Sequence, residues 1–138
     1  MYYHNLDQMD TISKISALTK DLLYYSESEH PFSVEQWELA SLDELPAKIG
    51  SLTQTDPSQQ RVIAHADFFH KMTRIVDPND KPMIANAQKA RELYQYLQEE
   101  FNTIQVIRVE GSSVIPIFIA CMLPGGNCVV LRTTAIET

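Results

Sequence analysis

The stretch YYSESEHPF, residues 24–32, places two carboxylates, Glu27 and Glu29, among serines and aromatic residues. The hydrophobic pattern before it predicts an amphipathic helix that ends here, where the negative end of the helix dipole disfavours both glutamates. An exposed carboxylate on a short turn is a hard oxygen donor, the kind of ligand that Mg²⁺ accepts. The stretch is also typical of a polar connection whose serines solvate the end of a helix.

The stretch HADFFH, residues 65–70, contains a second candidate cluster, formed by His65, Asp67 and His70. These residue types suit a metal site or acid–base chemistry, and they leave open a small metal-dependent hydrolase as an alternative function. The i, i+5 spacing of the histidines directs them to different helix faces, whereas the i, i+4 spacing of H-E-x-x-H directs two ligands to one face. The simpler interpretation is a helix capped by Asp67, with both histidines at the surface.

The chain contains two cysteines, Cys121 and Cys128, on either side of a Pro-Gly-Gly turn. Their spacing matches no zinc motif, and buried thiols are expected rather than a disulfide. The four glycines form no phosphate-binding loop ahead of a helix, and no G-x-S-x-G nucleophile motif is present. No cofactor is therefore expected.

The formal net charge of −7, from 18 acidic and 11 basic side chains, argues against direct binding of nucleic acid. A partner protein with a basic nucleic-acid cleft would instead attract this chain as a mimic of DNA, although solubility also explains such a charge. No apolar run reaches the roughly 18 residues of a membrane span, and the first residues lack a signal-peptide pattern. We expect a cytoplasmic protein that does not enter membranes.

The first half of the chain shows weak and changing periodicity. Its expected elements are a helix at residues 10–25, strands at 32–39 and 61–64, and a helix that begins near Asp67 and carries Phe69, Met72 and Val76 on one face. Residues 41–60 are rich in Ser, Thr, Pro and Asp. This composition predicts a long loop with room for one short helical turn.

The second half shows clearer periodicity and predicts the fold class. Its expected elements are a helix from about Pro82 to Phe101, strands at 104–109, 117–123 and 128–134, and turns at Gly111 and residues 124–127. The strand at 117–123 is apolar on both faces, which predicts a central strand covered on each side. We therefore expect one α+β domain, residues 1–138, built as an α-β-α sandwich around a central, mainly antiparallel sheet.

The stretch SESEHPFSVEQWE, residues 26–38, resembles the nuclease A inhibitor family, whose members block sugar-non-specific nucleases of the ββα-metal type. The similarity continues at the DFF sequence of residues 67–69, at the turn of residues 124–127 and at the final pair Glu137-Thr138. The resemblance implies an α-β-α sandwich similar to plant pathogenesis-related proteins. It also implies an inhibitor without chemistry of its own, which acts on a sugar-non-specific DNA/RNA endonuclease.

The resemblance further implies a set of partner-binding residues. Glu27 corresponds to the glutamate that enters the nuclease cleft and ligates the catalytic Mg²⁺ of the enzyme, with Ser28 and Glu29 beside it. Thr138 corresponds to a C-terminal threonine whose carboxylate and hydroxyl meet a basic group of the nuclease. An acidic loop beyond the DFF helix supplies a third contact, which corresponds to Asp77 here.

Two positions depart from the family pattern. Pro78 stands where the family has a tryptophan, and His30 stands where it has a tyrosine. Because an aromatic anchor is often an interface hot spot, the departure at Pro78 leaves open an alternative, a binding module of the same fold with a different protein partner. We expect a monomer before binding in either case.

Overall fold

The computed structural model describes residues 2–123 and 126–138, with side chains from residue 10 onward. Within these residues the chain forms a five-stranded antiparallel sheet in the order β3-β7-β6-β5-β4 and a separate two-stranded sheet of β1 and β2. The strands are β1 (Leu23–Tyr25), β2 (Glu29–Pro31), β3 (Ser33–Glu38), β4 (Gln60–Ile63), β5 (Ile104–Val109), β6 (Val114–Met122) and β7 (Asn127–Ile136). The helices are α1 (Tyr2–Thr19), α2 (Leu45–Thr53), α3 (His65–Thr73) and α4 (Lys81–Glu100), with short 3₁₀ turns η1 (Leu42–Glu44) and η2 (Pro57–Gln59).

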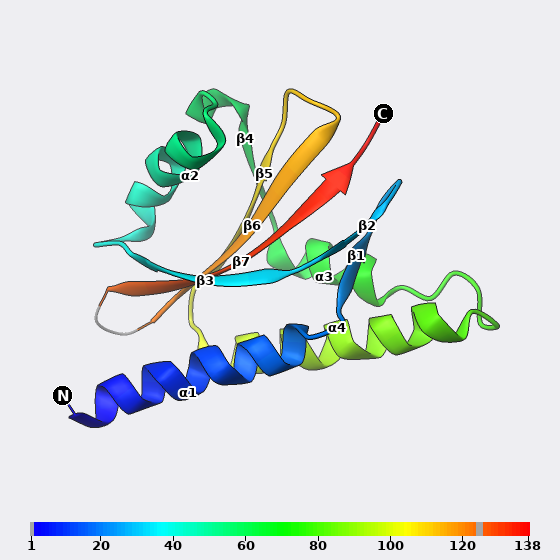
Figure 1. Cartoon of the computed structure of the whole chain (residues 1–138), viewed down its shortest axis with the longest axis horizontal. Coiled ribbons are helices and arrows are strands. Elements are labelled where there is room, and N and C mark those ends of the chain that lie inside the picture. The colour runs from blue at the N-terminus through cyan, green and yellow to red at the C-terminus, as the bar shows by residue number, and fades with distance from the viewer. Residues whose placement is uncertain (1, 124–125) are drawn as a thin grey trace.

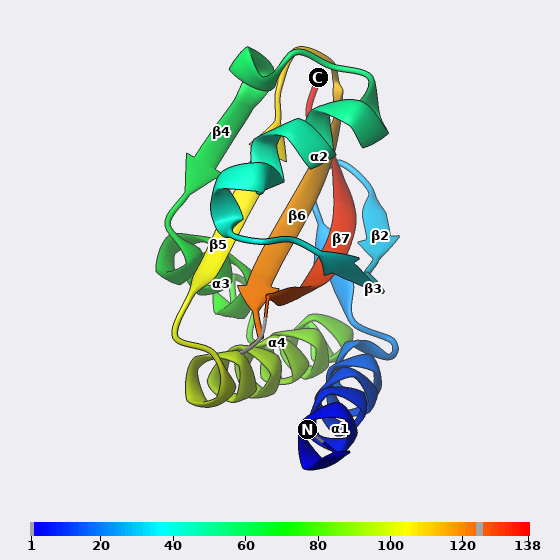
Figure 2. The ribbon, with the colours of Figure 1, turned by 90° about the vertical axis from the view of Figure 1, so that its left-hand side faces the viewer.

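Helices cover both faces of the larger sheet (Figure 1). On one face, α1, α3 and α4 pack in a hydrophobic cluster that includes Ile15, Phe69 and Leu97. On the other face, α2 packs through Leu45 and Ile49 in a second cluster, and Figure 2 shows it in front of the sheet. The α+β class and the α-β-α sandwich are therefore confirmed, whereas the likeness to pathogenesis-related proteins stays a prediction.

The described helices include none with the length and apolar character that a membrane span requires.

Strand β6 lies in the middle of the sheet, between β5 and β7. Ile117 and Ile119 belong to the cluster beneath α4, whereas Phe118 and Ala120 belong to the cluster beneath α2, and these side chains are fully buried. The predicted central strand, covered on both faces, is confirmed. Pairing with β5 ends at Ile117, so the missing N–H of Pro116 lies outside that ladder.

The three C-terminal strands form the predicted antiparallel meander. Strand β6 begins at Val114, before its predicted start, and ends at Met122, whereas β7 extends beyond its predicted range at both ends. Gly111, in the connection between β5 and β6, has a φ of 103°, a conformation that glycine adopts without strain. The predicted turn at residues 124–127 includes residues 124–125, which lie outside the described part of the chain.

The first helix, predicted at residues 10–25, both begins and ends earlier than predicted, at Tyr2 and Thr19. It stops at Thr19, whose hydroxyl donates to the carbonyl of Ile15 at 2.9 Å, and Asp21 then takes a left-handed backbone with φ 63°. Asp tolerates this conformation better than most residues, and it ends the helical path before β1. The expected end near Tyr25 is therefore wrong, and so is the helix-dipole explanation for the two glutamates that follow.

Residues 41–60 contain a helix where composition predicts a loop. Leu45 and Ile49 lie about one turn apart in α2, and both side chains are fully buried. A proline occupies the first turn of this helix, where a missing N–H costs no hydrogen bond. Gln54 ends the helix in a left-handed conformation. Because α2 buries few side chains, its hydrophobic pattern is too short to be recognised in this polar stretch of sequence.

The boundaries of α3 also differ from the prediction, whereas those of α4 agree with it. Ala64 holds the N-cap position of α3, so Asp67 lies within the first turn instead of capping it. The helix ends before Val76, which is exposed. At α4, the carboxylate of Asp80 accepts a hydrogen bond from the N–H of Met83 at 3.1 Å and caps the helix.

Cys121 and Cys128 are free and buried, as predicted. Cys121 packs in the cluster beneath α4 and Cys128 in the cluster beneath α2, so the sheet lies between the two thiols. Burial raises the pKa of both, to about 11 for Cys128. Neither thiol is therefore a reactive thiolate near neutral pH.

Candidate functional site

The hairpin of β1 and β2 carries Glu27 at its turn. Tyr25 pairs with Glu29 across the hairpin, and residues 26–28 connect the two strands. The N–H of Ser26 donates to the carbonyl of Ser28 at 2.8 Å and closes this connection. The Glu27 side chain is thereby presented to solvent from a short turn.

The turn of the hairpin is attached to the end of β7, far from it in the sequence. The N–H of Glu27 donates to the carbonyl of Ile136 at 3.2 Å, and the N–H of Ile136 donates to the hydroxyl of Ser26 at 2.9 Å. Figure 1 shows the hairpin beside the end of β7 and the C-terminal residues. The position of Glu27 is therefore set by the larger sheet as well as by its own hairpin.

Thr138 holds both oxygens of the Glu27 carboxylate. Its N–H donates to Oε2 and its hydroxyl donates to Oε1, each at 2.5 Å, between residues 111 positions apart in the sequence. Both hydrogen bonds lower the pKa of Glu27 below its ordinary value of 4.5, and the one from the hydroxyl has the larger effect. The carboxylate is therefore charged, oriented and accessible at neutral pH.

The residue before Thr138 is fixed in turn by an arginine of the sheet. Arg108 on β5 donates from Nη2 to Glu137 at 2.8 Å and from Nε to Glu110 at 3.1 Å. The N–H of Glu137 donates to the carbonyl of Ser113 at 2.9 Å. The hydrogen bond from Arg108 is the main cause that lowers the pKa of Glu137.

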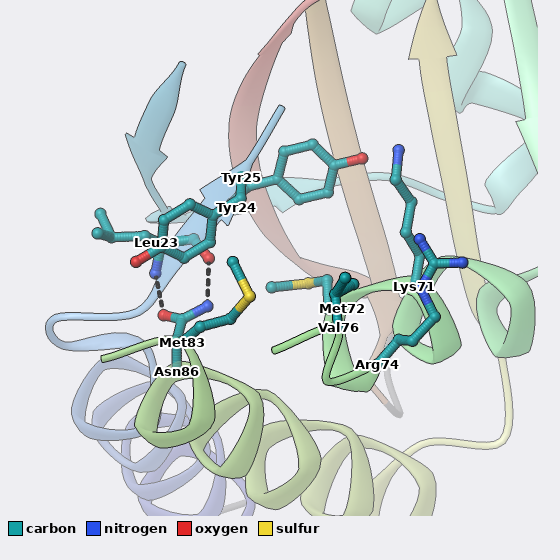
Figure 3. Close-up of a pocket in the computed structure, with 9 residues that line it drawn as sticks. All are labelled: Leu23, Tyr24, Tyr25, Lys71, Met72, Arg74, Val76, Met83 and Asn86. Carbon is teal, nitrogen blue, oxygen red and sulfur yellow. Dashed lines mark hydrogen bonds between the residues drawn. The ribbon is translucent and has the colours of Figure 1, made fainter. Parts of the chain in front are cut away.

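A buried asparagine anchors the first strand of the hairpin to α4. The N–H of Leu23 donates to Oδ1 of Asn86 at 2.8 Å, and Nδ2 of Asn86 donates to the carbonyl of Leu23 at 2.8 Å (Figure 3). Asn86 is 8% exposed. The Asn86 amide thus satisfies both backbone groups of Leu23. In the described sheets β1 pairs with β2 alone, so no strand lies on the side of β1 that faces Asn86.

A surface pocket of about 140 Å³ separates the hairpin from the segment after α3. Leu23 and Tyr25 line it from β1, Met72 and Val76 from α3 and the segment after it, and Met83 from α4 (Figure 3). Lys71 and Arg74 also line the pocket, which therefore lies between the hairpin and the segment that leads into Asp77.

Asp77 lies in a compact turn between α3 and α4. Its carboxylate accepts a hydrogen bond from the N–H of Asn79 at 2.9 Å, and its carbonyl accepts one from the N–H of Asp80 at 3.1 Å. Pro78 occupies the second position of this turn, where its fixed φ is favourable. The turn lies at the same end of the molecule as the hairpin and the C-terminal residues (Figure 1).

Ser28 and Glu29, the two residues that follow Glu27, have other contacts. The hydroxyl of Ser28 lies 3.0 Å from Nδ1 of His30. Burial raises the pKa of Tyr25, and the negative charges of Glu29 and Asp80 raise it further. Glu29 is therefore close to the ring that borders the pocket, whereas Glu27 is held by Thr138.

The histidine cluster of α3 does not assemble into a metal site. Nδ1 of His65 lies 2.6 Å from the hydroxyl of Tyr94, and Asp67 and His70 are exposed. Among the residues that the structure describes, no group of three or more His, Cys, Asp or Glu side chains is placed to hold a metal ion. The hydrolase alternative has no support from this arrangement.

The family model described as nuclease A inhibitor-like protein matches residues 9–138. The chain belongs to this family. The family predicted from the SESE stretch is thus confirmed over nearly the whole chain. Membership indicates a general role in nuclease inhibition, with a nuclease as the protein partner. A comparison with curated proteins gives no match.

Of the residues that the family resemblance selects, the structure brings Glu27 and Thr138 into direct contact and places Asp77 in a separate turn. Sequence reasoning missed Asn86, Arg108 and Glu137. An asparagine one turn before the buried Ala90 was a signal for Asn86, because a polar residue in an apolar helix stripe needs a partner. Arg108 and Glu137 carried no such signal.

Replacement of Asn86 by alanine should loosen the hairpin and destabilise the protein. Asn86→Ala removes both hydrogen bonds to Leu23 and leaves its backbone groups without a partner, at a cost of roughly 1–3 kcal/mol in the free energy of unfolding. Chemical denaturation measures this difference. The control is Gln88→Ala, which removes an exposed amide from the same helix, where water replaces its hydrogen bonds, and should change stability little. Equal stability of the two variants would contradict this role of Asn86.

The contact between Glu27 and Thr138 should depend on pH. Because the folded pKa of Glu27 is lowered, its contribution to stability is present above about pH 4.5 and is lost as the pH falls through the folded value. Thr138→Val removes the hydroxyl and should raise the pKa of Glu27, measured by NMR titration of its side-chain carboxyl carbon. Thr134→Val, on β7, is the control and should leave the titration unchanged. An unaltered Glu27 titration in Thr138→Val would show that the hydroxyl does not hold the carboxylate.

Proposed function

We propose that the protein is a non-catalytic inhibitor of a sugar-non-specific DNA/RNA endonuclease, and that Glu27 is the ligand it presents to the catalytic Mg²⁺ of that enzyme. The observation that carries this proposal is the Glu27 carboxylate, exposed at a hairpin turn and held through both oxygens by Thr138. A group ordered before binding loses little conformational freedom in the complex, which favours affinity.

The chemistry of a single carboxylate fits this role. Mg²⁺ is usually bound through one or two carboxylates together with waters and phosphate oxygens, so one glutamate from an inhibitor suffices as a ligand. Each Glu27 oxygen accepts one hydrogen bond from Thr138 and retains a further lone pair. Glu27 would take the position of a phosphate oxygen or a water of the nuclease site.

The charge of the protein supports a basic partner. A net charge of −7 attracts a cleft that has evolved to hold a polyanion. Glu27 and Asp77 are both exposed. Their carboxylates would imitate phosphates of nucleic acid in the nuclease cleft, without the protein binding nucleic acid itself.

Thr138 and Asp77 would supply supporting contacts. After the Thr138 hydroxyl donates to Glu27, its oxygen retains lone pairs that can accept from a basic group of the nuclease. Asp77 is held in a turn that Pro78 stiffens, so its exposed carboxylate meets a partner without much loss of conformational entropy. Pro78 itself provides less contact area than the tryptophan of the family pattern, and the acidic groups carry more of the interaction.

Replacement of Glu27 by glutamine should weaken inhibition. Glu27→Gln keeps the side-chain volume but removes the negative charge that a divalent ion and a basic cleft attract, and the inhibition constant should rise by about tenfold or more. Glu27→Ala should weaken inhibition at least as much. Inhibition constants are measured against a panel of sugar-non-specific nucleases, with thermal midpoints to verify folding.

Glu29→Gln is the matched control, with the same chemical change two residues away. It should inhibit nearly as well as the parent protein. A damaging Glu29→Gln together with a neutral Glu27→Gln would show that the ligand had been assigned to the wrong glutamate. A parent protein that inhibits no nuclease of the panel would refute the proposed function.

Extension of the chain beyond Thr138 should also weaken inhibition. Added residues crowd the contact between Thr138 and Glu27, whereas an extension before residue 1 is expected to do little. The measurement compares an affinity tag at either end in the same inhibition assay. Equal potency of the two proteins would remove Thr138 from the binding surface.

A further inference from the structure

We infer that Arg108 and Glu137 are positioning residues for the inhibitory carboxylate: their ion pair fixes the chain so that Thr138 holds Glu27. This inference rests on the proposed function and adds to it a device, built into the sheet, that orders the binding group before the partner arrives. Neither residue is part of the SESE stretch or of the acidic turn at Asp77.

Arg108 is well placed to act as an anchor. It lies on β5, and β6 separates this strand from β7 (Figure 2). The Arg108 side chain nevertheless contacts Glu137, which follows β7. The guanidinium contacts Glu110 and Glu137 at once, at 3.1 and 2.8 Å, and its side chain is only 12% exposed. A planar guanidinium with two carboxylate partners is held in one orientation, which a single contact would not ensure.

Glu137 is the point at which this anchor acts on the chain. The ladder between β6 and β7 ends with the pair Val114 and Ile136, so Glu137 is the first residue beyond it. Its N–H donates to the carbonyl of Ser113 at 2.9 Å, and its carboxylate accepts from Arg108. With main chain and side chain both attached, Glu137 directs the next residue toward the hairpin.

Without this attachment, residues 137 and 138 would extend past the last ladder pair with few contacts to hold them, and they would lose order. The two donors of Thr138 would then contact Glu27 only part of the time. The carboxylate would sample more rotamers, and the nuclease complex would require their ordering during binding. The ion pair therefore acts on inhibition through Thr138, with no contact of its own to the partner.

The experiment measures order in the free protein and inhibition with the same variants. Arg108→Gln and Glu137→Ala each remove the ion pair, and the second alters an exposed residue, so it tests the inference even where the first impairs folding. In both variants the ¹⁵N order parameter of the Thr138 amide should fall from about 0.85, typical of rigid backbone, to below about 0.6. The inhibition constant should rise by about tenfold, mainly through faster dissociation.

Arg61→Gln is the matched control. Arg61 lies 3.8 Å from the same Glu110, is exposed, and loses the same charge on replacement, but its ion pair does not include Glu137. It should leave both the Thr138 order parameter and the inhibition constant near those of the parent. The effect that the lost positive charge of Arg108→Gln has on association with a basic cleft is thereby subtracted.

The double variant Arg108→Gln/Glu137→Ala distinguishes positioning from independent contacts. If the two residues act through one ion pair, the double variant should inhibit about as well as the weaker single variant. Additive losses, an unchanged Thr138 order parameter, or lost order without lost inhibition would each overturn the inference. These outcomes leave the proposed function intact as long as Glu27→Gln still weakens inhibition, so the two failures are distinguishable.

Discussion

The attachment of the small hairpin to the end of β7 is the interaction on which the rest of the site depends. A two-stranded hairpin is marginally stable on its own in water, so it would not by itself hold a group at its turn in place. The hydrogen bonds from Ile136 and Thr138 connect this hairpin to a strand that is paired on both sides within the larger sheet. That sheet is buried under helices on both faces, and Asn86 adds a second attachment from α4. The rigidity of the core is thereby transmitted to an exposed carboxylate.

Electrostatics and hydrogen bonding act in the same direction at this surface. Hydrogen bonds from Thr138 stabilise the charged form of Glu27, and Arg108 stabilises the charged form of Glu137. Both carboxylates therefore remain ionised well below neutral pH. At Glu27 the donors are neutral groups of Thr138, so they stabilise the charged form of the carboxylate without cancelling its charge.

The sequence was sufficient to predict the elements whose periodicity is long and unambiguous. The apolar stripe predicted α4, and three β-type segments separated by turns predicted the meander of β5, β6 and β7. The middle segment is apolar at nearly every position, which predicted a strand covered on both faces. The SESE stretch predicted the family. Sequence reasoning erred where short apolar runs fit two periods: the spacing of Leu22 and Tyr25 continues a helix, yet the left-handed Asp21 ends the helical path and Leu23–Tyr25 forms a strand. It also missed α2, whose few buried residues are dispersed among polar ones.

The assembly of the site, in contrast, follows from the three-dimensional arrangement of the strands and not from any local sequence pattern. Glu27 and Thr138 are 111 positions apart, and Arg108 lies on a strand that does not neighbour the one leading to Thr138. No local pattern records these contacts, because hydrogen bonds between distant segments leave no periodic signal in the chain. Residue types set which carboxylates and donors were available, whereas the order of strands in the sheet decided which of them meet.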